Sequence, residues 1–235
     1  MALWDALILL RIENAFMPKF PRLVVPGYPH HVTQRGIRKQ QTFFDDSDYQ
    51  AYIDLVKELK IKAGVAIWAY CLMPNHIHVI AVPKERQSLA RLFGTAHHRY
   101  AKRVNAMHDW RGHLWQERFY SVVMDETHTL AAMRYVELNP VRAGLCKNAE
   151  DWRWSSVHCN LGTMVDKMID DSDVRDVISD WRCFLSEDSK PDLIESLRAQ
   201  TNTGRPFGNE HFIDELERKT ERRIRRSNPG PAPER

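Results

Sequence analysis

The sequence predicts an α+β domain in which an antiparallel sheet carries two helices on one face, the split βαβ arrangement. The candidate elements of its first two thirds follow the order strand, helix, strand, strand, helix, strand, helix. The two central strand candidates, V-A-I-W-A-Y-C-L and H-I-H-V-I-A-V-P, are separated only by the turn M-P-N, which is typical of a hairpin. We therefore expect a ferredoxin-like sheet, followed by a helical C-terminal extension.

Local patterns place the elements of the first half. The segment Y-P-H-H-V-T-Q-R-G, from Tyr28, predicts the first strand. Asp46 or Ser47 is expected to cap a helix over about 48–63, where the apolar residues follow a helical spacing. Gly64 then ends this helix and leads into the hairpin.

The second half of the domain is placed in the same way. Apolar residues at i, i+3 and i+4 predict a helix over about 86–105, and L-W-Q-E-R-F-Y-S-V-V-M predicts the last strand. The stretch from Asp125 to Asn139 is helical in composition. Because a proline disfavours helical geometry in the residue before it, Pro140 is expected to move Asn139 out of the helical region and end the helix.

Composition bounds the class of protein. With 235 residues, 43% hydrophobic and 28% charged, the chain has ordinary globular proportions, which excludes a wholly disordered or collagen-like chain. Four widely spaced cysteines without a C-x-x-C pair indicate a reducing, cytoplasmic compartment. The apolar run near the N-terminus is about nine residues long, short of the ~20 that cross a bilayer, so no membrane association is expected.

Charge and composition divide the chain into segments. The net charge of +3 hides a positive first part, since residues 1–162 carry +6 and residues 163–200, where one or two acidic helices are expected, carry −5. The expected segments are a non-native or disordered extension over 1–16 before Met17, the main domain over 17–162, a helical extension over 163–217, and a basic, Pro-rich tail over 218–235.

His76 and His78 are candidate metal ligands. Successive side chains of a strand point to opposite faces, so these two imidazoles share one face and Ile77 points to the other. Neutral imidazole nitrogens bind divalent metals, and two of them on a strand form half a site that needs further ligands. The alternative interpretation is a half-exposed strand with two polar residues on its wet face.

Tyr135 and Asn139 form a second candidate pair. They lie four residues apart and therefore on one face of the late helix. Each has a structural alternative, because Tyr135 is also explained as a packing residue with a wet hydroxyl and Asn139 as a helix stop.

In combination, L-M-P-N-H-I-H-V, L-W-Q-E-R-F-Y, Y-V-E-L-N-P-V-R-A-G and D-W-R-W-S-S resemble the REP-associated tyrosine transposases, relatives of the single-strand transposases of the HUH endonuclease class. The resemblance runs from about Gly27 to Gly162. It implies that His76 and His78 bind the metal, that Tyr135 is the single nucleophile, and that Asn139 is a third, amide-bearing ligand. Glu137 lies nearby as a harder oxygen ligand.

The resemblance also implies an activity. Such a protein is a metal-dependent endonuclease and strand transferase of single-stranded DNA at palindromic, REP-like hairpins, and it acts through a 5′-phosphotyrosine intermediate in the bacterial cytoplasm, at the nucleoid. Two imidazoles and an amide leave positions for water and phosphate, which favours Mg²⁺ or Mn²⁺ over a closed zinc site. No Walker-type loop is found, so no nucleotide cofactor is expected.

Basic residues near the motifs predict a surface that follows DNA phosphates, although charged runs are commonly only solvated faces. The candidates for DNA binding are Arg35, Arg38, Lys39, Arg99, Arg103, Arg118 and Arg142. Tyr120 and Phe44 are candidates for stacking on unpaired bases. The basic run over 218–226 is interpreted either as a further contact to DNA or as a solvated helix face.

Three alternatives stay open. The adjacent pairs His30–His31 and His97–His98 are rival metal sites, but neighbouring side chains diverge, so we interpret them as structural or DNA-proximal. Two other functions are also open: a catalytically silent hairpin-binding protein, and an unrelated hydrolase that uses the histidine pair. The long C-terminal extension favours a monomer over a homodimer.

Overall fold

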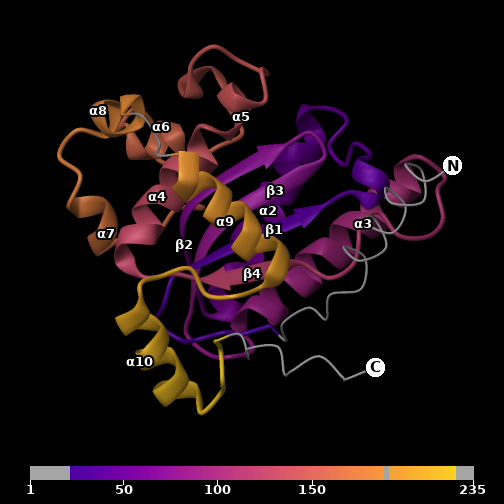
Figure 1. Ribbon diagram of the computed structural model, residues 1–235. Coiled ribbons are helices and arrows are strands. Elements are labelled where there is room, and N and C mark those ends of the chain that lie inside the picture. Colours follow the sequence, from indigo (N-terminus) through magenta and orange to yellow (C-terminus); the bar gives the residue numbers. More distant parts are fainter. Residues whose placement is uncertain (1–21, 188–190, 226–235) are drawn as a thin grey trace, which may run out of the picture.

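The computed structural model describes residues 22–187 and 191–225, in which helices lie on both faces of an antiparallel sheet (Figure 1). The strands are β1 His30–Arg35, β2 Val65–Met73, β3 His76–Pro83 and β4 Tyr120–Val123. Their spatial order is β2-β3-β1-β4, and each neighbouring pair is antiparallel. This is the split βαβ order, so the predicted α+β fold class is confirmed.

Helices of very different length connect and follow these strands. In chain order they are η1 Ile37–Lys39, α2 Asp46–Ala63, η2 Ala90–Gly94, α3 Thr95–Met107, α4 Glu126–Glu137, α5 Asn139–Arg142, η3 Ala149–Asp151, α6 Val157–Asn160, α7 Asp173–Asp176, α8 Trp181–Ser186, α9 Pro191–Thr203 and α10 Glu210–Thr220. Within the described ranges, none of them is long and apolar enough to cross a bilayer. The predicted extension over 1–16 and the Pro-rich end of the tail lie outside the described residues.

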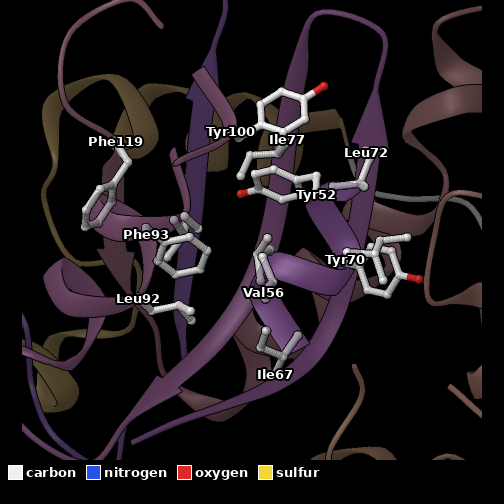
Figure 2. Close-up of a cluster of buried hydrophobic side chains, with 14 of the residues drawn as sticks. Tyr52, Val56, Ile67, Tyr70, Leu72, Ile77, Leu92, Phe93, Tyr100 and Phe119 are labelled. Atoms are coloured by element: carbon white, nitrogen blue, oxygen red, sulfur yellow. The ribbon is translucent and has the colours of Figure 1, made fainter. Parts of the chain in front are cut away.

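Helices α2 and α3 cover one face of the sheet. Side chains of alternate strand residues, such as Val32 and Ile77, point to this face and are fully buried. They pack against Tyr52 of α2, Phe93 of η2 and Tyr100 of α3, the apolar positions that the helical spacing picks out (Figure 2). The two predicted helices therefore share one face and one core.

The opposite face is covered by α4 and by helices of the C-terminal extension (Figure 1). Buried Cys71 and Ile80 of the sheet belong to the same apolar cluster as Met133 of α4, Trp181 of α8 and Leu197 of α9. All four cysteines are free thiols. Since α9 passes over this face, a site formed by β1, β3 and α4 is roofed by a segment that lies far away in the sequence.

The ends of α2 show how local chemistry sets an element. Its cap is Asp45 rather than the predicted Asp46 or Ser47, because the Asp45 carboxylate accepts hydrogen bonds from the backbone N–H groups of Ser47 (2.8 Å) and Asp48 (3.1 Å). The helix ends as predicted at Gly64, whose φ of 66° is in the left-handed region that glycine adopts without strain.

The last strand is shorter than its sequence pattern suggests. The predicted run L-W-Q-E-R-F-Y-S-V-V-M forms a strand only over Tyr120–Val123, while Trp115 makes a single bridge to Gly36. Glu117 lies between them with a φ of 60°, which interrupts extended geometry.

Asn139 does not leave the helical region as predicted. Helix α4 ends at Glu137, and Asn139 begins the short helix α5 directly after it. Pro140 lies in the first turn of α5, where its missing N–H has no helical partner to lose.

The acidic segment over 163–200 contains more helices than predicted. It holds α7, α8 and most of α9 rather than one or two helices. The side chains of Ser172 and Asp180 each accept a backbone N–H at a new helix start, which divides the segment.

The buried His97 is expected to make the domain less stable in acid. Its ring is 7% exposed within the α2–α3 core, and Nε2 lies 2.9 Å from the Tyr52 hydroxyl. Burial lowers the pKa of His97 to about 3, so the folded state excludes a proton that the unfolded chain binds below pH 6.5. His97 therefore does not lower the unfolding free energy above that pH, and it lowers this free energy progressively as the pH decreases below it.

We predict that His97→Gln reduces the acid sensitivity of the protein. From pH 7 to pH 5, His97 alone should cost about 2 kcal/mol of unfolding free energy, because the unfolded state gains the proton. Urea titrations at the two pH values measure this difference, which should shrink by about that amount in the variant. The same substitution at the exposed neighbour His98 is the control and should keep the wild-type difference. An unchanged difference in His97→Gln would contradict the prediction.

Candidate active site

A cavity of about 630 Å³ opens between the α4 face of the sheet, α5 and α9. This volume is ordinary for a binding site. All four residues that the motifs select as metal ligands or nucleophile, His76, His78, Tyr135 and Asn139, line it. Three separate elements, β3, α4 and α5, supply them.

The strand register places the two histidines. His76 and His78 lie opposite Arg35 and Thr33 of β1, on the face that α4 covers, and their ring centroids are 4.9 Å apart. Nδ1 of His78 lies 2.9 Å from Nε2 of His31. Among the described residues, no hydrogen bond engages Nε2 of either His76 or His78.

Both rings are neutral near pH 7. Burial, and secondarily the charge of Arg35, lowers the pKa of His76 to about 3. Burial also lowers the pKa of His78 well below its usual value, and the neighbouring His76 and His31 lower it further. A neutral imidazole keeps a lone pair on one nitrogen, which is the form that binds a metal ion.

Tyr135 brings a phenol to the same place. Its side chain is 8% exposed, and its ring centroid lies 5.7 Å from that of His78 and 6.2 Å from that of His31. The Arg142 guanidinium lies 4.1 Å from the centre of the Tyr135 ring and donates to the Tyr135 backbone carbonyl. The guanidinium of Arg198 lies 5.9 Å from the same centre. Phenol, imidazoles and guanidinium groups thus share one cavity.

The two candidates for a third ligand point in different directions. Asn139 is 9% exposed and lines the cavity, and its Nδ2 has no hydrogen-bond partner among the described residues. Glu137 is fully buried away from the cavity, where it accepts hydrogen bonds from Ser156 (2.5 Å), Asn160 (2.5 Å) and Trp181 (2.7 Å). Burial raises the pKa of Glu137 to about 7 against the effect of these donors.

The donor set fits a labile divalent ion. His76 and His78 offer two neutral nitrogens, and the side-chain amide of Asn139, whose oxygen is the metal-ligating atom of an amide, lines the same cavity. Within the described part of the chain, no group of three or more His, Cys, Asp and Glu side chains is arranged to hold a metal. With two imidazoles and one amide as protein ligands, an ion at the histidine pair would keep positions for water or phosphate oxygen, unlike a closed structural zinc site.

The cavity is positively charged. Four cationic side chains line it, Arg35, Lys39, Arg142 and Arg198, and none of its described lining residues is acidic. Arg38 is exposed in the adjacent η1. This charge pattern suits an anionic ligand such as a phosphodiester.

The other predicted DNA contacts lie elsewhere. Arg118 lines a second cavity at the edge of β4, together with Arg22. Arg99 and Arg103 are on α3, which covers the opposite face of the sheet. Arg99 pairs with Glu58 at 2.7 Å, and Arg103 lies 3.9 Å from a carboxylate oxygen of α2. A role of these residues in DNA binding stays a prediction.

The two stacking candidates are also separated. Tyr120 lines the main cavity, whereas Phe44 packs against His108 and Trp110, with ring centroids 4.5 and 5.6 Å away. In the basic tail, Arg225 pairs with three carboxylates of α10, which offsets part of the charge of that run.

Sequence reasoning missed several residues of the cavity. The sequence alone interprets His31 as structural or DNA-proximal, but it lies beside His78, while His30 is buried against the backbone of Val25 and Tyr28. Arg198 and Thr201 come from α9, for which the motifs give no signal. Strand alternation does place His31 on the face of Thr33 and Arg35, but only the β1–β3 register shows that this face meets His78.

The comparisons with known proteins bear on the family and the fold of this domain. The family model for IS200-like transposases matches residues 25–139, the stretch that holds the sheet, the histidine pair, Tyr135 and Asn139. This stretch of the chain is therefore similar to the IS200-like transposases, and the resemblance predicted from the motifs is confirmed. A search of curated protein sequences gives no match.

One solved structure supports the fold, and a second is similar over a shorter part of the chain. A REP-associated tyrosine transposase, solved bound to a REP hairpin, is 20% identical with a TM-score of 0.51, and the match covers 66% of this chain and 96% of that chain. A putative transposase from Deinococcus radiodurans is 18% identical with a TM-score of 0.37, over 51% of this chain and 96% of that one. About a third of this chain thus extends beyond the first match.

We predict that the buried contacts of Glu137 hold α4, and with it Tyr135, in place. Trp181→Phe should lower the unfolding free energy by roughly 2–4 kcal/mol, because a buried carboxylate loses a donor and the smaller ring leaves a gap. Urea unfolding measures the change. Trp110→Phe, at a ring that is 43% exposed, is the matched control and should shift stability by no more than about 0.5 kcal/mol. Equal effects of the two substitutions would contradict this role of Trp181.

Proposed function

We propose that this transposase-like chain is a metal-dependent nuclease and strand transferase of single-stranded DNA that acts through Tyr135. One observation carries the proposal: a phenol and two neutral imidazoles from distant parts of the chain meet in a single cationic cavity. The interpretation of Tyr135 as a plain packing residue does not explain why it lies among these groups.

The reaction needs charge neutralisation. A phosphodiester is anionic and repels nucleophiles, so cations must offset the charge that develops on its non-bridging oxygens. Arg142 and Arg198, which lie against the Tyr135 ring, are placed to bind the phosphate next to the phenol. A bound Mg²⁺ or Mn²⁺, held by His76 and His78 with Asn139, would act as a Lewis acid on the same phosphate.

The proposed step exchanges one phosphate ester for another. The Tyr135 hydroxyl oxygen forms a bond to phosphorus and loses its proton, while the bond from phosphorus to the 3′ oxygen breaks and that oxygen is protonated. The products are a 5′-phosphotyrosine and a free 3′-hydroxyl. Because the ester bond is kept in the intermediate, attack by a 3′-hydroxyl reverses the step and joins strands without ATP.

The substrate we propose is single-stranded DNA beside a short palindromic hairpin. The positive charge of residues 1–162 and the cationic cavity support a DNA partner. The REP-associated transposase with a similar fold was solved on a REP hairpin, which supports this class of substrate. Tyr120, at the rim of the cavity, offers a ring for an unpaired base.

Tyr135→Phe tests the proposal. With hairpin oligonucleotides and Mn²⁺, we expect the wild-type protein to form a covalent DNA adduct that migrates with the protein in denaturing gels, and the variant to form none, because it lacks the nucleophilic oxygen. Tyr120→Phe removes the other phenol of the cavity and should still form the adduct. Chelation with EDTA should abolish adduct formation by the wild-type protein.

The outcomes separate the alternatives. An adduct that survives in Tyr135→Phe would remove this residue from the chemistry. Tight hairpin binding by the wild-type protein without cleavage in any divalent metal would favour a catalytically silent binding protein. Metal-dependent hydrolysis retained in Tyr135→Phe would favour an unrelated hydrolase that uses the histidine pair.

A further inference from the structure

Three side chains form a hydrogen-bonded row that runs from α9 into the candidate metal site. Thr201 Oγ1 of α9 lies 3.3 Å from Nδ1 of His31, and Nε2 of His31 lies 2.9 Å from Nδ1 of His78. The planes of the two imidazoles are 9° from parallel and their centroids lie 5.1 Å apart, which suits an in-plane hydrogen bond between ring nitrogens. His31 is 1% exposed, so its ring is largely shielded from solvent.

The direction of each hydrogen bond follows from the first one. Thr201 has a single hydroxyl hydrogen, which it donates to the Leu197 carbonyl at 2.7 Å. Its oxygen must then accept from His31, so His31 carries its hydrogen on Nδ1 and a lone pair on Nε2. That lone pair accepts from His78, which therefore carries its hydrogen on Nδ1. The free lone pair of His78 is left on Nε2.

His76 is held in the same form by a different partner. Asn75 donates its side-chain Nδ2–H to the Lys39 carbonyl at 3.0 Å, which orients the amide. The Asn75 Oδ1 then faces Nδ1 of His76 at 2.5 Å and accepts its hydrogen. Both histidines of the pair consequently keep a lone pair on Nε2, the nitrogen that no described residue engages.

We infer that Thr201 and His31 are positioning residues that fix His78 in the tautomer whose Nε2 binds the divalent ion. The inference rests on the proposed metal site but adds a contribution from outside the matched family segment, since Thr201 lies beyond residue 139. Docking of α9 is thereby coupled to metal binding. The ligand-bearing form of His78 would be only partly populated if α9 were displaced.

The expected loss of metal affinity follows from the role of groups that orient a metal-bound histidine. Loss of a group that orients a metal-bound histidine typically weakens metal binding 10- to 100-fold, about the change expected for His31→Phe, which keeps a ring but offers no acceptor. His31→Gln is the conservative variant, because its carbonyl oxygen can accept from His78, and it should recover most of the affinity. Thr201→Val should weaken binding about 2- to 10-fold, the equivalent of one hydrogen bond, whereas Thr201→Ser keeps the hydroxyl and should not.

Two measurements test the inference on the full chain without DNA. Long-range ¹H–¹⁵N spectra of the metal-free protein report the tautomer of each histidine, and we expect His78 and His31 to carry hydrogen on Nδ1. Titration with Mn²⁺, followed by the electron paramagnetic resonance of the free ion, gives the affinities of the four variants. Unfolding midpoints show whether each variant is folded. If His31→Phe does not fold, the comparison of Thr201→Val with Thr201→Ser still tests the inference.

The results separate this inference from the proposed function. Hydrogen on Nε2 of His78 in the wild-type protein, or equal Mn²⁺ affinity in Thr201→Val and Thr201→Ser, would overturn the relay and leave the chemistry of Tyr135 standing. The expected tautomers with the expected order of Mn²⁺ affinities would support the relay even if no DNA adduct forms.

Discussion

The candidate site depends on the antiparallel pairing between β1 and β3, which places its side chains opposite each other. Thr33 faces His78 and Arg35 faces His76, and a shift of one residue would turn both imidazoles into the α2–α3 core. The apolar contacts of α4 on the same face then fix the distance from Tyr135 to the histidines. The register of one strand pair and the packing of one helix thus carry the geometry of the cavity.

Burial serves two purposes at this site. Desolvation keeps the imidazoles neutral near pH 7 and therefore able to bind a metal ion. The guanidinium groups beside them supply positive charge whether or not a metal ion is bound. The C-terminal extension contributes to this burial, since Leu197 and Thr201 line the cavity. Helix α9 roofs the cavity and brings Arg198 and Thr201, although it lies outside the segment that the family model matches. The extension is part of the site rather than an appendage.

The fold and the centre of the site follow from the sequence because both rest on local rules. Hairpin and helix periodicity predict the order of elements, and strand alternation puts His76 and His78 on one face. The errors have local causes that periodicity does not report, such as the positive φ of Glu117 that shortens β4. The roles of His31 and α9 depend on strand register and on the docking of a distant helix, which no motif encodes.

The position of a bound ion tests the account most directly. Anomalous diffraction at the manganese edge, from crystals of the full chain grown with Mn²⁺, locates the ion without assumptions about activity. We expect one peak within bonding distance of Nε2 of both His76 and His78, with the Tyr135 hydroxyl facing the same side of the cavity. Crystals in which the histidine pair is empty, or in which Mn²⁺ binds at another cluster, would contradict the account.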